Sequence, residues 1–156
     1  MIGMLEALKE FSGLKPRCQW VADKSGVSYF NDSKGTNVGA TVAALNGLGD
    51  SLPVGRKIIL IAGGVGKGAE FAELAEPMQQ YARGLVYIGE DGPVLAKALD
   101  TVPQQSADTM QDAVRKAADM ACAGDIVLLS PACASFDMFS GFPARGDAFI
   151  DAVEDL

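Results

Sequence analysis

Charged, hydroxyl and glycine residues gather in three short segments of the chain, 32–37, 63–68 and 130–135, each of which follows an extended or apolar run. Lys34 and Lys67 supply positive charge, and the glycines leave backbone N–H groups accessible. The hydroxyl groups come from Ser33, Thr36 and Ser135. Ammonium, hydroxyl and amide groups all donate hydrogen bonds to negatively charged oxygens, so these segments are suited to binding a carboxylate or a phosphate.

The residue types that are absent restrict the chemistry further. The chain has no histidine, which removes the commonest general base, the commonest metal ligand and every Ser-His-Asp arrangement. Its cysteines, Cys18, Cys122 and Cys133, are far apart and form no CxxC pair, so neither a disulfide framework nor a cysteine-rich zinc site is expected. Without a histidine partner, Cys133 is expected to be a packed small residue and not a nucleophile.

The glycine-rich segment admits three interpretations. It is not a P-loop, because no glycine lies five residues before Gly66 and because Gly68 stands where a serine or threonine must bind magnesium. Gly64, Gly66 and Ala69 fit the dinucleotide pattern G-x-G-x-x-A, with Glu90 at the end of the next predicted strand. The alternatives are a strand-to-helix turn that needs small residues, and an anion site to which the neighbouring lysine contributes.

The other two segments also have purely structural explanations. Asp32 and Ser33 precede a predicted helix, where they are ordinary capping residues, and a lysine such as Lys34 is usually solvated. The segment 130–135 combines a proline and a cysteine with small residues, which favours a closely fitting surface. Three aromatic residues follow it, Phe136, Phe139 and Phe142. Aromatic side chains at this spacing more often belong to a core than to a ligand site, so a core position is expected.

Strand and helix patterns alternate along the chain. Continuous apolar runs are typical of parallel strands covered on both faces, and apolar residues at helical spacing indicate the helices between them. The predicted strands are 18–22, 27–31, 57–62, 85–88, 103–106 and 126–129, and the predicted helices are 4–11, 38–48, 70–81, 93–99, 109–121 and 144–153. The turn Asp23–Gly26 joins the first two strands and predicts a β-hairpin. The pattern predicts one α/β domain, a mostly parallel sheet with helices on both faces, which binds ligands at the carboxyl ends of its strands.

Composition and charge set the remaining limits. The formal net charge is −7, and the thirteen basic residues are scattered, whereas binding to nucleic acid requires clustered lysine and arginine. No apolar run approaches the roughly 20 residues that a transmembrane helix needs, and the first residues lack the pattern of a secretory signal. We therefore expect a cytoplasmic protein with neither a nucleic-acid nor a membrane partner.

Several segments together resemble the Mur ligases of peptidoglycan synthesis. They occur in the order and at the spacing of that family, and the resemblance covers residues 14–156. The matching segments are Gly13-Leu14-Lys15-Pro16-Arg17, Asn31-Asp32-Ser33-Lys34-Gly35-Thr36-Asn37, Gly63-Gly64-Val65-Gly66-Lys67, and Leu128 to Phe139 with Arg145-Gly146 beyond it. The resemblance implies a Rossmann-like, carboxy-terminal, amino-acid-binding domain over 14–156, with 1–13 as the end of the central-domain helix and the hinge.

The resemblance is strongest to the members that add D-glutamate to UDP-N-acetylmuramoyl-L-alanine. In the family, ATP phosphorylates the terminal carboxylate of one substrate, and the amine of the incoming amino acid attacks the acyl phosphate. The ATP-binding P-loop, the Mg²⁺ ligands and the uridine-nucleotide site belong to the two preceding domains. The resemblance therefore implies a bacterial, monomeric ligase domain that is inactive when isolated.

The resemblance also implies roles for individual residues. The D-glutamate site would comprise Lys34, Thr36, Lys67, Ser135, Phe136 and Phe142. Arg17 and Asp32 would reach the ATP ribose and phosphates when the domain closes. No metal ligand and no residue that performs bond chemistry by itself is expected in this chain. Two alternatives remain open on the residues alone: a free-standing dinucleotide-binding module, and a non-catalytic α/β interaction domain.

Overall fold

The computed structural model describes residues 18–156, so the predicted helix 4–11, the proposed hinge and Arg17 lie outside the described residues. Six strands form one sheet in the order β1-β2-β6-β3-β4-β5. The elements are β1 Gln19–Lys24, β2 Val27–Asn31, α2 Val38–Asp50, β3 Ile58–Gly63, the 3-10 helix η1 Ala72–Leu74, α3 Ala75–Tyr81, β4 Ala82–Ile88, α4 Gly92–Ala98, β5 Gln104–Ser106, α5 Met110–Met120, β6 Ile126–Leu129 and α6 Phe142–Glu154.

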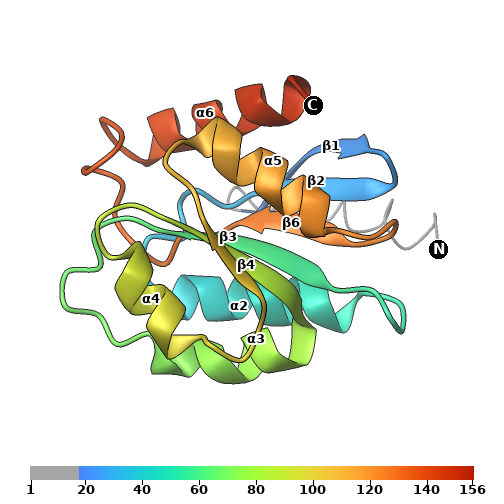
Figure 1. Ribbon diagram of the computed structural model, residues 1–156, viewed down its shortest axis with the longest axis horizontal. Helices are drawn as coiled ribbons and strands as arrows, with labels where there is room; N and C mark the ends of the chain where they lie inside the picture. Colours follow the sequence, from blue (N-terminus) through green and yellow to red (C-terminus); the bar gives the residue numbers. More distant parts are fainter. Residues whose placement is uncertain (1–17) are drawn as a thin grey trace.

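The sheet is the middle layer of three. Helices α2, α3 and α4 cover one face and α5 and α6 cover the other (Figure 1). Only β1 runs antiparallel to its neighbour, and the other five strands are parallel. All residues of β3 and β6 are buried, as their continuous apolar sequences predict for central strands. The predicted Rossmann-like α/β fold with a leading β-hairpin is confirmed.

The hairpin turn is shorter than predicted. Lys24 pairs with Val27, which leaves Ser25 and Gly26 as a two-residue loop. Both loop residues have positive φ, 53° and 80°, as in the turns whose twist matches that of the flanking strands. The first strand therefore continues two residues beyond the predicted end.

Two predicted helices differ from those observed. The helix predicted for 70–81 is a 3-10 turn followed by α3, because Pro77 has no N–H and is tolerated only in the first turn of an α-helix. The last helix begins at Phe142, two residues before its predicted start, with Pro143 in its first turn. This earlier start places Phe142 on a helix end and not in the preceding loop.

The carboxyl ends of β3 and β6 form a topological switch point of the sheet. These strands are neighbours, but β3 leads to α3 on one face whereas β6 leads to α6 on the other. Chain segments that leave adjacent strands towards opposite faces open a binding crevice at that point. The loops 63–68 and 130–135 begin there, and the loop 32–37 begins at β2, on the other side of β6.

Candidate functional site

The three loops singled out in the sequence are joined by backbone hydrogen bonds. The loop 130–135 lies in the middle. Its Ala132 amide donates to the Gly35 carbonyl at 2.7 Å, and Ala134 exchanges two hydrogen bonds of 2.9 Å with Val65. The loops therefore form one continuous surface at the carboxyl edge of the sheet.

Close backbone contact explains the glycine at position 64. A Cβ atom there would lie 2.2 Å from the Ala134 carbonyl oxygen, and the residue has a φ of +130°, a region that favours glycine. Gly63 likewise donates its amide to the Pro131 carbonyl at 3.0 Å. These glycines let two loops meet, which is the structural role that small residues in this segment allow.

Two lysines and a threonine are exposed on the combined surface. Lys34 and Thr36 come from one side of the central loop, and Lys67 comes from the other. Ser135 follows Ala134 directly and is 3% exposed. Since Ala134 pairs with Val65, the loops that carry Lys67 and Ser135 lie together at the same edge of the sheet.

The aromatic residues after the central loop are not all core residues. Phe136 is 70% exposed and Phe142 is 38% exposed, so the predicted core position is wrong for both. Phe139 is partly buried against the helix α5–α6 side of the core. The Lys34 ammonium lies 5.9 Å from the centre of the Phe142 ring, within the range of a cation–π contact. These two side chains border a hollow of about 310 Å³ that also includes Asn31 and Asp147.

A buried arginine for which the sequence predicted no role holds two of the loops together. Arg145 is 1% exposed, and its guanidinium donates to the Ser33 hydroxyl at 3.1 Å, the Ser33 carbonyl at 2.8 Å and the Cys133 carbonyl at 2.9 Å. Burial lowers the pKa of Arg145 to about 10, although Cys133 and Asp137 nearby act to raise it. The guanidinium remains charged at neutral pH, beneath the surface that carries Lys34.

Of the two residues expected to reach ATP, only Asp32 lies among the described residues, and it is buried, unlike the two lysines. Arg17 lies outside the described residues. Asp32 is 1% exposed and accepts a hydrogen bond of 2.9 Å from the Ser130 hydroxyl. Ser33 is also buried, and its hydroxyl donates to the Phe142 carbonyl at 2.6 Å. Asp32 and Ser33 therefore stabilise the loop 32–37 from its buried side, whereas Lys34 and Thr36 are exposed to solvent.

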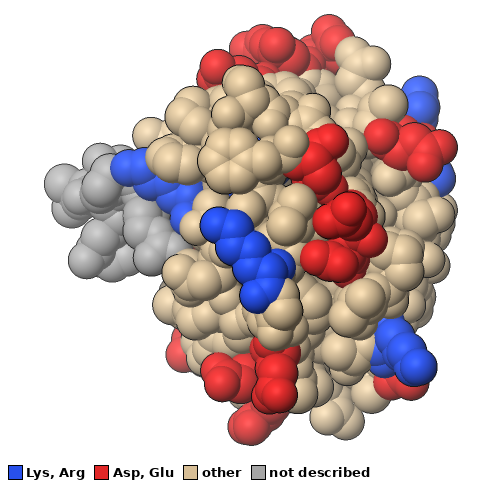
Figure 2. Space-filling model, turned by 90° about the vertical axis from the view of Figure 1, so that its left-hand side faces the viewer, with Lys and Arg blue, Asp and Glu red and all other residues tan. Residues whose placement is uncertain are grey.

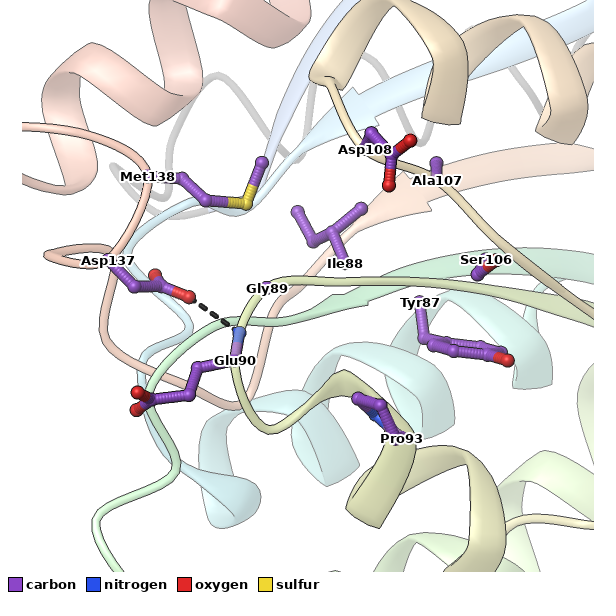
Figure 3. Close-up of a pocket in the computed structure, with 10 residues that line it drawn as sticks. All are labelled: Tyr87, Ile88, Gly89, Glu90, Pro93, Ser106, Ala107, Asp108, Asp137 and Met138. Atoms are coloured by element: carbon purple, nitrogen blue, oxygen red, sulfur yellow. Dashed lines mark hydrogen bonds between the residues drawn. The ribbon is translucent and has the colours of Figure 1, made fainter.

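Carboxylates lie beside the glycine loop, at the end of β4. The Asp91 carboxylate accepts from the Gly66 amide at 2.7 Å, and the Asp137 carboxylate accepts from the Glu90 amide at 2.7 Å. Glu90, Asp108 and Asp137 line a hollow of about 460 Å³ (Figure 3). A phosphate at this loop would need the amide that Asp91 occupies and would face a like charge. This geometry argues against the dinucleotide interpretation.

Basic and acidic side chains thus lie on neighbouring parts of the same edge. Figure 2 shows lysine or arginine side chains beside a group of aspartate and glutamate side chains on the face that contains the strand-end loops.

Among residues 18–156 there is no group of three or more histidine, cysteine, aspartate or glutamate residues arranged to hold a metal ion. Within the same range, no helix is long and apolar enough to cross a membrane.

Cys133 has the properties expected of a packed residue. It is 1% exposed, and burial, with a smaller contribution from the charge of Asp91, raises the pKa of its thiol to about 12. A thiol that stays protonated at neutral pH is a poor nucleophile. The prediction that Cys133 is a structural residue agrees with this environment.

Solved structures share the architecture. The chain superposes on UDP-N-acetylmuramate–alanine ligase from Thermotoga maritima with a TM-score of 0.61, at 15% identity, over 97% of this chain and 33% of that one. It superposes equally well, with a TM-score of 0.61 at 20% identity, on Escherichia coli FolC in complex with DHPP and ADP, over 86% of this chain and 31% of that one. At these identities the likeness shows a shared fold.

Sequence comparison gives the family. Residues 16–133 match the family described as Mur ligase, glutamate ligase domain, and the chain belongs to this family, as the resemblance predicted. It is 53% identical over 154 residues to UDP-N-acetylmuramoylalanine–D-glutamate ligase of Pseudomonas aeruginosa and 57% identical over 153 residues to the ligase of the same name in Hahella chejuensis. These matches cover 98% and 97% of this chain but 34% of each relative, so the chain spans about a third of their length.

Proposed function

We propose that this chain is the D-glutamate-binding, carboxy-terminal domain of an ATP-dependent ligase that joins D-glutamate to UDP-N-acetylmuramoyl-L-alanine. The observation that supports the proposal is that backbone hydrogen bonds join the three loops, two of which carry the exposed Lys34 and Lys67. The names of the relatives supply the substrate, since both are D-glutamate ligases. Residues 1–13 would then be the end of the central domain and the hinge.

D-glutamate carries two carboxylates, and the loop surface offers a matching set of donors. Lys67 and Ser135 would hold one carboxylate, and Thr36 with Lys34 at the edge would hold the other. An ammonium group held near a carboxylate gives a charge-assisted hydrogen bond, which is stronger than a neutral one. Two such anchors fix the orientation of the amino acid, so that its amine points at the acyl group to be attacked.

The exposed aromatic residues would complete the site. Phe136 and Phe142 border the loop surface, and closure of a neighbouring domain over them would exclude water from the reacting acyl phosphate. Residues of this chain would thus bind, orient and shield the nucleophile. The bond-forming chemistry would take place between the domains.

ATP and Mg²⁺ fit this chain only in part. Lys34 and Thr36 are outward-facing donors suited to an anionic phosphate chain or to the amino-acid carboxylate, and Asp32 lies just beneath them. ATP supplies the phosphoryl group that activates the acyl substrate. We assign its main contacts, and those of Mg²⁺, to the preceding domains, with Arg17 and Asp32 contributing on closure. We further propose that the ligase is monomeric and cytoplasmic.

The test joins this chain to the two preceding domains and measures D-glutamate-dependent phosphate release. Lys67→Ala and Ser135→Ala should raise the KM for D-glutamate by about tenfold or more, because each removes a hydrogen bond worth about 1.5–3 kcal/mol when charge-assisted. Lys97→Ala is the matched control, since it removes an exposed lysine from α4. The proposal fails if both variants behave like this control, or if the isolated chain forms product at a normal rate.

A further inference from the structure

Asp91 at the end of β4 is bonded to the glycine loop in two places. Its carboxylate accepts from the Gly66 amide at 2.7 Å, and its own amide donates to the Gly64 carbonyl at 2.8 Å. The two bonds bracket Val65, the residue that pairs with the central loop. Asp91 therefore clamps the backbone from which Lys67 projects.

The Asp91 carboxylate does not cap the helix that Asp91 precedes. Asp91 is the N-cap residue of α4, where an aspartate ordinarily accepts a hydrogen bond from an amide in the first helical turn. Here its side chain makes no such bond. A Cβ atom on Gly66 would lie 2.9 Å from the Phe71 ring and 3.3 Å from the Asp91 carboxylate, so a larger residue there would have to displace the ring and crowd the carboxylate.

The residue after Gly66 has a conformation that needs external support. Lys67 has a φ of 54°, in the left-handed region that residues with a side chain seldom adopt. Such conformations persist where the surrounding structure over-determines them. The Asp91 bond fixes the residue before Lys67, and the bond from the Ala69 amide to the Gly66 carbonyl, at 2.9 Å, closes the turn after it.

We propose that Asp91 is a positioning residue that fixes the direction of the Lys67 side chain towards the amino-acid carboxylate. This inference rests on the proposed function. It explains why a carboxylate stands beside an anion site: its oxygen is bound to a backbone amide and does not receive the ligand.

Two substitutions separate this role from general stability. Asp91→Asn keeps an oxygen that can accept from the Gly66 amide, so the KM for D-glutamate should stay within about threefold of wild type. Asp91→Ser supplies a hydroxyl that is suited to capping α4 but ends one bond short of the Gly66 amide. In the assembled ligase, this variant should keep its melting temperature and raise the KM for D-glutamate about 10- to 100-fold, because a small misplacement of a binding group has an effect of this size. The KM for ATP should change less than twofold.

A control and a double-mutant cycle complete the experiment. Glu90→Ala removes an exposed carboxylate one residue away and should leave the KM for D-glutamate unchanged. If Asp91 acts through Lys67, adding Asp91→Ser to Lys67→Ala should cause little further loss. The inference is overturned if Asp91→Ser matches Glu90→Ala, if Asp91→Asn is as impaired as Asp91→Ser, or if the two losses are additive. If Lys67→Ala alone has no effect, this inference is overturned, and if Lys67→Ala and Ser135→Ala both have no effect, the proposed function fails.

Discussion

Replacing Arg145 with methionine should destabilise the domain by about 4 kcal/mol. The substitution removes three hydrogen bonds from a charged donor, each worth about 1.5–3 kcal/mol. It also relieves the cost of burying the charge. The fall in the pKa of Arg145 from an ordinary 12.5 to about 10 corresponds to about 3 kcal/mol. The bonds together outweigh this cost, which leaves a net loss of roughly 2–6 kcal/mol.

Whether Arg145→Met lowers stability depends on the buried polar groups that remain after the guanidinium is removed. A buried ion pair can be replaced by apolar residues at little cost, because both charges leave together. Here the Ser33 and Cys133 carbonyls stay buried after Arg145 is removed, and each loses its donor. Unsatisfied carbonyls retain the full cost of desolvation, so the substitution cannot be neutral by that route.

Urea unfolding of the wild-type domain and of Arg145→Met, followed by circular dichroism, measures the difference in unfolding free energy. A loss of about 4 kcal/mol should lower the melting temperature by roughly 8–16 °C for a domain of this size. Arg145→Lys keeps the charge but not the planar fork, so it should lose less. Arg115→Met is the control, because this arginine is exposed and pairs only with Asp112 on the same helix among the described residues, a contact worth at most about 0.5 kcal/mol. A loss below about 1 kcal/mol for Arg145→Met would refute the reasoning.

Three further predictions follow from other contacts. Burial opposes ionisation of Asp125, but its hydrogen bonds to Arg83 and to backbone amides hold its pKa below the ordinary 3.8. Asp125 therefore contributes stability above that pH, and the difference in unfolding free energy between wild type and Asp125→Asn should shrink as the pH falls below 3.8. At pH 8 a thiol reagent should label the exposed Cys122 and spare Cys133, whose pKa is raised to about 12, and rapid labelling of native Cys133 would contradict its burial. Gly47→Ala should raise the unfolding free energy by about 0.5–1 kcal/mol in a denaturation curve, because Gly47 lies in helix α2 with open space where a Cβ atom would be added; a loss of stability would contradict this.

Several elements of the fold were predictable because they depend on local sequence. The apolar runs that became β3 and β6 can be buried only between two layers of helices, so their sequence alone indicates central parallel strands. Carboxyl ends of parallel strands lie at one edge of a sheet, so the predicted strand pattern is sufficient to put the loops 32–37, 63–68 and 130–135 at the same edge. The cap of α2 is also local, since Asn37 accepts from Ala40 three residues away.

Other features depend on which segments become neighbours, and only the tertiary structure decided them. Asp91 has the sequence of a helix cap, yet its carboxylate binds the Gly66 amide 25 residues away. Arg145 lies in a predicted helix with no sign of its partner in the sequence, yet it binds Ser33 across 112 residues and is buried. Phe136, expected in the core, is exposed, and it follows a loop whose backbone is bonded to the loops on both sides. Periodicity along a chain reports whether an element is buried, but the partner of a polar group is set by the order of the strands, which brings distant residues within hydrogen-bonding distance.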